Sequence, residues 1–113
     1  MPALLCTLGT DAEDAALNRP VLVLRAAEVA GARALLDPQL APLALTLLTA
    51  WQAVFGASRL PMLRAELQQA LARIAAADLP DTLVPALALQ RLATTSATAQ
   101  EFGLNLYIRA EDE

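Results

Sequence analysis

The sequence predicts an α/β fold that is predominantly helical, in which about three short strands pack against about four helices. Ala and Leu dominate a chain that is 57% hydrophobic but only 4% aromatic, and this composition favours helices over sheets. Most of the chain also carries apolar residues at helical spacing, whereas only short runs show the pattern of a strand. At 113 residues, the chain is expected to form a single compact domain over residues 1–113 that needs neither disulfides nor a metal to fold.

Three segments are predicted as strands. Residues 3–8 form an apolar run that is closed by Gly9, and residues 21–25 are rich in branched apolar residues on both faces, as in a strand covered on both sides. The link between them is about a dozen residues long, so the sequence leaves parallel pairing open. Residues 104–109 alternate apolar and polar side chains, which predicts a half-exposed strand that joins the other two at an edge of the sheet.

The helical segments are predicted from capping residues, prolines in first turns and apolar periodicity. Thr10 and Glu13 have the spacing of a capping box, which predicts a short helix between the first two strands that ends near Asn18. Weak helix formers in residues 94–98 leave it open whether that stretch is helical. The four longer predicted helices comprise residues 26–36, 42–56, 59–77 and 83–101.

The uncharged segment 40–57 is expected to organise the rest of the domain, because the nearest charges on either side are Asp37 and Arg59. Pro42 suits the first turn of a helix, and Gly56 suits its end. Both faces of this helix are apolar or only mildly polar, which predicts a central helix that is buried on two sides. A symmetric partner would cover any part of it that one chain leaves open, so a homo-oligomer is predicted.

The same segment is too short for a membrane span. A helix over residues 42–57 covers about 24 Å, whereas crossing the hydrocarbon core requires roughly 20 apolar residues and ~30 Å, and Gln52 would lie inside it. The N-terminus lacks the features of a signal peptide and a single Cys suits a reducing compartment, so the protein is expected to be cytoplasmic. All eight basic residues are Arg, a bias that fits the codons of a GC-rich bacterial genome.

Composition argues against several classes of function. A net charge of −4 with scattered Arg residues disfavours nucleic-acid binding, which needs a concentrated basic face. With no His and one Cys, the chain has no Ser-His-Asp or Cys-His arrangement and no zinc cluster of its own, and no catalytic, cofactor-binding or metal-binding residue is predicted. Cys6 is expected to be a small buried hydrophobe, with Arg25 as the only local cation for a reactive thiol. The acidic residues at 11–14 are expected to complement the dipole of the short helix that begins there. Those at 111–113 are expected to be solvated.

The leading hypothesis is a non-enzymatic protein-interaction, accessory or chaperone-like module that acts as a homo-oligomer, with itself or another protein as the partner. Its basis is the excess of apolar helix beside the absence of catalytic side chains. The alternative is a small apolar-ligand-binding domain with a pocket beside the 42–56 helix, lined by Leu47, Trp51 and Phe55. Core packing is the first role expected of the large aromatic residues, and contact with a partner or ligand is the second. The candidate partner or ligand contacts are Trp51, Phe55, Tyr107 and Arg109.

The third hypothesis is an enzyme that uses Pro2. Removal of Met1 would leave a secondary amine at the start of a predicted strand, and this start resembles that of tautomerases, which use such a proline as a base and have a similar chain length. The resemblance implies an amine that is neutral at pH 7, with a pKa lowered by burial and a nearby cation, for which Arg25 or Arg109 is available. Tautomerases contain two β-α-β units, however, and the four consecutive helices predicted here leave no second unit.

Overall fold

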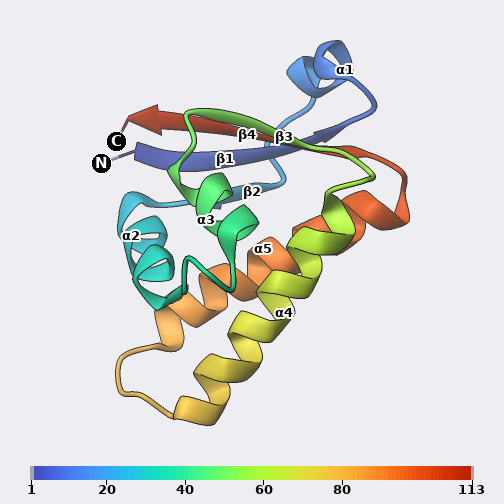
Figure 1. The fold of residues 1–113 in the computed structure, drawn as a ribbon. Helices are drawn as coiled ribbons and strands as arrows, with labels where there is room; N and C mark the ends of the chain where they lie inside the picture. The colour runs from blue at the N-terminus through green and yellow to red at the C-terminus, as the bar shows by residue number, and fades with distance from the viewer. Residues whose placement is uncertain (1, 113) are drawn as a thin grey trace.

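The structure is a computed structural model that describes residues 2–112, which form one four-stranded sheet and five helices (Figure 1). The α/β class is confirmed, but the prediction of about three strands and four helices is wrong. The strands are β1 (Pro2–Gly9), β2 (Leu22–Leu24), β3 (Gln52–Phe55) and β4 (Asn105–Asp112). The helices are α1 (Ala12–Leu17), α2 (Ala26–Leu35), α3 (Pro42–Thr49), α4 (Leu60–Ala77) and α5 (Leu83–Glu101). Met1 and Glu113, the last residue of the predicted acidic tail, lie outside the described residues.

The strands are all antiparallel and lie in the order β2-β1-β4-β3. Leu5 of β1 lies opposite Val23 of β2, so the parallel pairing that the sequence left open is replaced by an antiparallel one. The prediction that the C-terminal strand forms an edge is wrong, because β4 lies between β1 and β3, with Arg109 opposite both Leu5 and Gln52. The first and last strands therefore lie side by side in the middle of the sheet (Figure 1).

The segment predicted as one helix over residues 42–56 is divided into α3 and β3. α3 ends at Thr49, Ala50 has an extended backbone, and the chain then enters the sheet. In β3, Gln52 is exposed and Phe55 is fully buried, and the aromatic and β-branched residues of this stretch favour a strand. Pairing with β4 gives the β3 backbone its hydrogen bonds. The prediction of a central helix that is buried on two sides is therefore wrong. The helix ends at Thr49, and within α3 the side that carries Thr46 and Thr49 is exposed.

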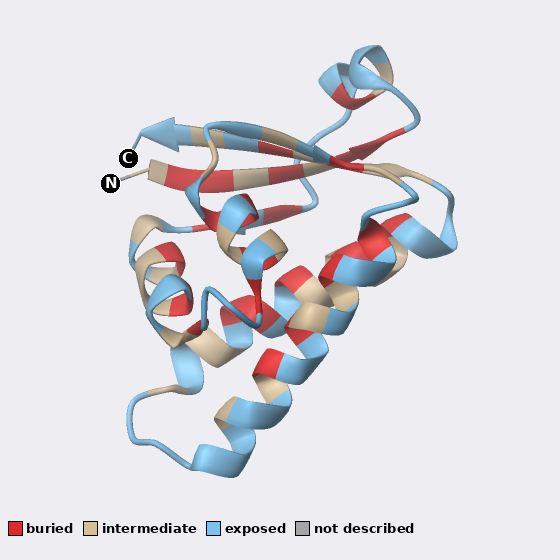
Figure 2. Ribbon diagram, viewed as in Figure 1, coloured by how far each residue is buried: buried red, intermediate tan, exposed pale blue. Residues whose placement is uncertain are grey.

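α2, α3, α4 and α5 cover one face of the sheet, whereas α1 lies on the opposite face, at one end (Figure 1). The core lies between the sheet and the four covering helices, where Figure 2 shows most of the buried segments. Its largest fully buried side chains come from both layers and include Leu4, Leu24, Phe55 and Leu106 from the sheet and Leu47, Leu63, Leu89 and Leu92 from the helices.

Cys6 on β1 belongs to this core and is fully buried, which confirms the expected small buried hydrophobe. Desolvation raises the pKa of the Cys6 thiol from 9.0 to about 12, because an apolar environment disfavours the charged thiolate. The thiol is therefore protonated and a poor nucleophile at neutral pH.

α1 is the short helix that the sequence predicts, but its cap lies one residue later than the expected capping residue Thr10. The Asp11 carboxylate accepts a hydrogen bond from the Asp14 amide at 2.8 Å, and the Asp14 carboxylate accepts one from the Thr10 amide at 2.8 Å. Gly9 allows α1 to approach the sheet closely, since a Cβ atom at this position would lie only 2.7 Å from the backbone nitrogen of Ala15.

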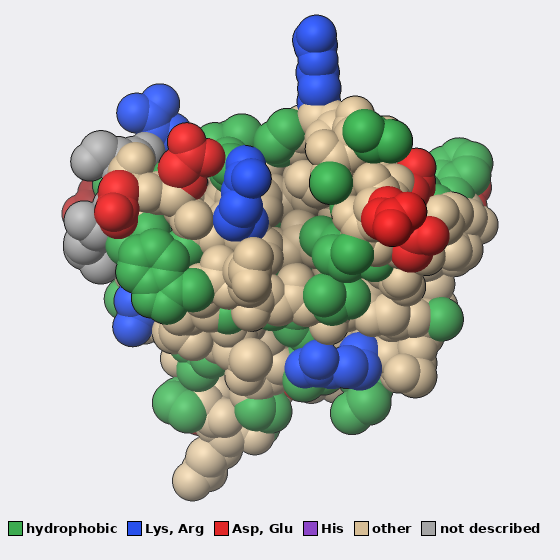
Figure 3. All heavy atoms as spheres, turned by 90° about the horizontal axis from the view of Figure 1, so that it is seen from above, with side chains coloured by type: hydrophobic (Ala, Val, Ile, Leu, Met, Phe, Trp, Pro, Cys, Tyr) green, Lys and Arg blue, Asp and Glu red, His purple; other side chains and the backbone are tan. Residues whose placement is uncertain are grey.

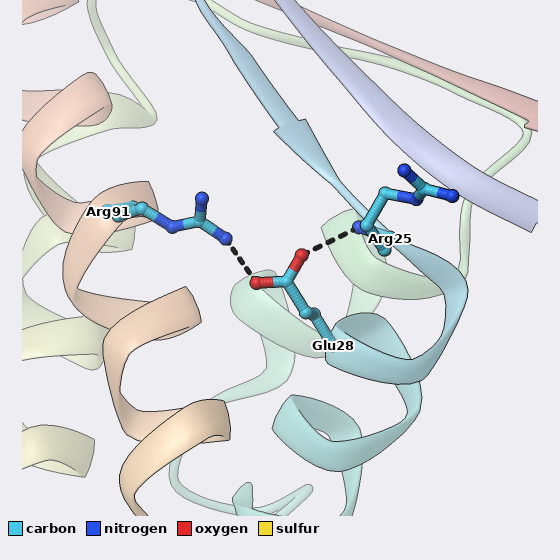
Figure 4. Close-up of polar contacts among 3 residues, drawn as sticks. All are labelled: Arg25, Glu28 and Arg91. Carbon is cyan, nitrogen blue, oxygen red and sulfur yellow. Dashed lines mark hydrogen bonds and ion pairs between the residues drawn. The ribbon is translucent and has the colours of Figure 1, made fainter.

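The carboxylate of Glu28 joins α2 to α5 (Figure 4). One oxygen accepts a hydrogen bond from the Arg25 backbone amide at 3.0 Å, which caps the first turn of α2, and the other binds the guanidinium of Arg91 on α5. Because the ion pair is partly exposed, its net contribution to stability is small. Its role is to fix the start of α2 against the middle of α5.

Candidate interaction surfaces

The four residues predicted as partner or ligand contacts lie in three different environments. Phe55 is fully buried, and the guanidinium of Arg59 lies 4.4 Å from the centroid of its ring. Trp51 precedes β3 and is 65% exposed. Tyr107 and Arg109 alternate onto the outer face of β4, the face that α2–α5 leave uncovered. Of the four, the structure therefore brings together only Tyr107 and Arg109.

The pocket predicted beside the 42–56 helix is not formed by the expected residues. Leu47 and Phe55 are fully buried in the core while Trp51 is exposed, so these three side chains do not line a common cavity. The hollow beside α3 lies instead between α2 and α3, is open to solvent and has a volume of about 620 Å³. Its lining includes Ala30, Arg33, Leu45 and Thr46.

A second hollow, the sheet groove, lies between α1 and the outer face of the sheet and has a volume of about 410 Å³. Tyr107 is flanked there by Thr7 on β1 and Val54 on β3. Arg109 lies in the next row of side chains, with its guanidinium 3.7 Å from the carboxylate of Glu111. Figure 3 looks down on this face, on which acidic side chains gather at both ends. The sheet groove thus combines a hydroxyl, a phenol and a cation with an apolar wall of α1 alanines.

The free end of the α4–α5 hairpin contributes no buried side chain to the core. Ala70 is the last buried residue of α4, Ala88 is the first of α5, and none of residues 71–87 is buried. Figure 2 shows this end of the hairpin as largely exposed. The segment is nevertheless mostly apolar, and its exposed large side chains are Leu79, Leu83, Val84 and Leu87. Exposed large apolar side chains that gather in one segment are typical of interaction sites.

A groove follows one face of this hairpin and consists of two adjoining hollows of about 500 and 160 Å³, which share Leu71 and Gln90. Along α4, the residues that line this hairpin groove are Arg64, Gln68, Leu71, Ile74, Ala75 and Asp78. Along α5, they include Leu83, Leu87, Gln90, Ala93, Thr94 and Ala97. Spacings of three and four residues place each set on one face of its helix, which is the pattern against which further helices pack.

The two ends of the hairpin groove differ in charge and in side-chain size. Asp78 and Asp81 lie at the free end, where the lining residues of α5 include Leu83 and Leu87 as well as Ala86. Arg64 lies at the other end, where the lining residues of α5 are alanines and a threonine. The Arg64 guanidinium donates a hydrogen bond to the side-chain oxygen of Gln100 at 2.6 Å, which holds it at this position.

Sequence reasoning identified both helices of the hairpin but missed its groove. Apolar periodicity shows which face of a helix is apolar, but not at which turn the core ends. The sequence signal for the groove is the group Leu79, Leu83 and Leu87, large apolar residues that lie in or soon after the break between the two predicted helices.

The structure places Pro2 opposite Asp112, an acidic residue, rather than opposite a cation. Arg109 is three residues away on β4, roughly 10 Å along the strand. The first two strands pair antiparallel, whereas a β-α-β unit requires parallel strands. Within residues 2–112, no group of three or more Asp, Glu or Cys side chains is placed to hold a metal ion. No helix in this range is long and apolar enough to cross a membrane.

Comparisons of the chain with protein-family models, with curated protein sequences and with solved structures found no match. Function is therefore inferred from the geometry of the hairpin groove and of the sheet groove.

Proposed function

We propose that this protein is a non-enzymatic interaction module that self-associates through the hairpin groove. The observation that carries the proposal is the apolar surface of residues 71–87, from which no side chain is buried in the described chain. Single exposed apolar side chains are normal on a monomer, but here three large ones, Leu79, Leu83 and Leu87, line a groove of about 500 Å³ between two helices. Helices of a partner chain would bury this surface.

The length of the hairpin supports the same proposal. Ordering a residue costs roughly 1–2 kcal/mol of backbone entropy, which buried contacts normally offset. Residues 71–87 contain no fully buried side chain, and of their large apolar side chains only Leu71 and Ile74 pack partly against the core, so this part of α4 and α5 depends largely on backbone hydrogen bonds and on the high helix propensity of its Ala and Leu residues. A partner in the groove would supply the missing burial, at roughly 25 cal/mol per Å² of apolar surface.

Multi-angle light scattering and sedimentation velocity across a range of protein concentrations test this proposal. Wild-type protein is expected to exceed the monomer mass at micromolar concentrations. Leu83→Glu combined with Leu87→Glu should return it to the monomer, because two charges would then lie in the groove, and Glu is itself a good helix former. Leu17→Glu is the matched control, since Leu17 is 87% exposed on α1, outside the groove, and this variant should associate like wild type. Wild-type protein that stays monomeric at every concentration would refute the proposal.

Binding of a small carboxylate ligand in the sheet groove is a second candidate function. The observation that favours it is the placement of Tyr107 and Arg109 side by side in one hollow with Thr7. A guanidinium recognises a carboxylate, while a phenol ring and alanine side chains accommodate an apolar body. This site differs from the pocket expected beside α3.

Phenylacetate titrated into labelled protein, with backbone amide shifts followed by NMR, tests this second function. Shifts are expected at Thr7 and Tyr107 and should be lost in Arg109→Gln. Arg73→Gln is the control, because Arg73 is an exposed cation that does not line the sheet groove. Equal shifts in both variants would reject ligand binding at this site.

A further inference from the structure

We propose that the hairpin groove is filled by the hairpin groove of a second copy of this chain, in antiparallel orientation, so that four helices form a symmetric bundle. This inference rests on the self-association proposed above and adds the orientation, the register and the contacts. Its defining contact is Arg64 of each copy with Asp78 of the other copy.

The centre of the groove fixes the position of the two-fold axis. Leu71 on α4 and Gln90 on α5 each line both hollows, so they lie at the middle of the groove. A two-fold axis at this level, perpendicular to the helices and lying between the two copies, places each helix antiparallel to its own counterpart. Leu71 then packs on Leu71 of the second copy, and the two Gln90 amides meet as donor and acceptor.

Charge complementarity supports this orientation. Arg64 precedes Leu71 by seven residues and Asp78 follows it by seven, so the two charges lie about 10.5 Å on either side of the axis. Antiparallel packing therefore places Arg64 of one copy opposite Asp78 of the other, twice in each dimer, and Asp81 adds negative charge at the same end. Parallel packing would bring the two Arg64 side chains together and the two acidic ends together, which like-charge repulsion disfavours.

Side-chain size gives the same register along α5. Leu83 precedes Gln90 by seven residues and Ala97 follows it by seven, so Leu83 of one copy lies on Ala97 of the other. Leu87 and Ala93, three residues on either side of Gln90, are matched in the same way. Each leucine that α5 contributes to the groove thus meets an alanine, and this match in size allows close packing between the two copies of α5.

Two charge reversals that complement each other test the orientation. Arg64→Glu alone places Glu opposite Asp78 of the second copy, and Asp78→Arg alone places Arg opposite Arg64, so each variant is expected to dimerise at least about tenfold more weakly than wild type. In a mixture of the two variants, the mixed dimer has an opposite-charge pair at both contacts. Its dissociation constant is expected to lie within about threefold of that of the wild-type dimer, measured by sedimentation velocity with one chain labelled.

Matched variants separate this effect from changes in folding or in overall charge. Arg73→Glu makes the same charge change at an exposed position of α4 outside the groove and should leave dimerisation unchanged. Because Asp78 has a left-handed backbone (φ 47°), Asp78→Asn provides a variant that tolerates this conformation and should weaken the dimer by removing charge alone. Circular dichroism should show all of these variants folded.

The outcomes distinguish this inference from the function on which it rests. If wild-type protein is monomeric, both the self-association and the antiparallel bundle are overturned. If wild-type protein dimerises but the mixture of Arg64→Glu and Asp78→Arg does not restore association, the antiparallel register is overturned while self-association stands. If Arg73→Glu weakens the dimer as much as Arg64→Glu does, net charge rather than the proposed contact is responsible, and the register is again overturned.

Discussion

The buried thiol of Cys6 is expected to make this protein less stable at alkaline pH. Below pH 9.0 the thiol is protonated in both the folded and the unfolded chain, so it adds no pH dependence. Above pH 9.0 the unfolded chain loses the proton, whereas burial in the folded chain raises the pKa of the thiol to about 12 and the proton is retained. Deprotonation therefore stabilises the unfolded state, and the free energy of unfolding falls as the pH rises from 9.0 towards 12.

Between pH 8 and pH 10, titration of Cys6 is expected to lower the free energy of unfolding by about 1.4 kcal/mol, since pH 10 lies one unit above the pKa of the unfolded thiol. This value hardly depends on the folded pKa, because pH 10 is far below it. Urea unfolding of wild type and of Cys6→Ala, under reducing conditions and at one protein concentration, measures the loss. The alanine variant is less stable at both pH values because of the cavity it leaves, but it lacks the titration. Groups common to both proteins cancel, so the difference in unfolding free energy between them should shrink by about 1.4 kcal/mol from pH 8 to pH 10. A difference that stays constant would refute the reasoning.

Two further substitutions test how the elements are joined. Gly9→Ala is expected to lower the free energy of unfolding by about 1–3 kcal/mol, because its Cβ would lie 2.7 Å from the backbone nitrogen of Ala15. Gly56→Ala, whose Cβ would meet one side-chain oxygen at 3.4 Å, is the matched control in the same urea titration, and equal losses would argue against the close packing of α1. Arg91→Ala should lower the free energy of unfolding by no more than about 1 kcal/mol, since the ion pair of Arg91 with Glu28 is partly exposed. This loss should decrease at high salt, and a larger, salt-independent loss would show that the Arg91 side chain acts through packing instead.

The long helices of this protein were predictable because their apolar periodicity is sustained over many turns. The helix predicted over residues 83–101 has the same bounds as α5, and the one predicted over 59–77 begins one residue before α4. Residues 94–98, which the sequence left open, are helical, and their hydroxyl groups donate to carbonyl groups four residues earlier. A local preference against the helix was therefore outweighed by its surroundings.

The division of segment 42–56 was not predictable from local pattern alone. Its apolar residues fit a helical period up to Thr49, but those after it fit the two-residue period of a strand equally well. The choice depends on β4, which supplies hydrogen-bond partners to residues 52–55 from about fifty positions further along the chain. The local pattern is thus compatible with both structures, and the pairing that decides between them is long-range. For the same reason the sequence assigned the sheet edge to the wrong strand.

The candidate surfaces show the same division between local and long-range information. Alternation along β4 correctly predicted that Tyr107 and Arg109 share one face, because that depends only on strand geometry. The sheet groove also requires α1 to lie over the sheet, which depends on its contact with Gly9. The hairpin groove requires full burial along α4 to end at Ala70, and this is set by the packing of the other elements.

The free edges of the sheet offer a second route to self-association, but the structure disfavours it. β2 has three residues and β3 has four, so each edge presents few backbone groups to a second sheet. On β3, the Arg59 guanidinium donates a hydrogen bond to the Val54 carbonyl at 3.2 Å while it lies over the Phe55 ring, so a charged side chain occupies part of this edge. An incoming strand would have to displace it. The hairpin groove presents complementary charges and sizes at its two ends, so a second copy is expected to bind on the helical side of the molecule rather than to extend its sheet.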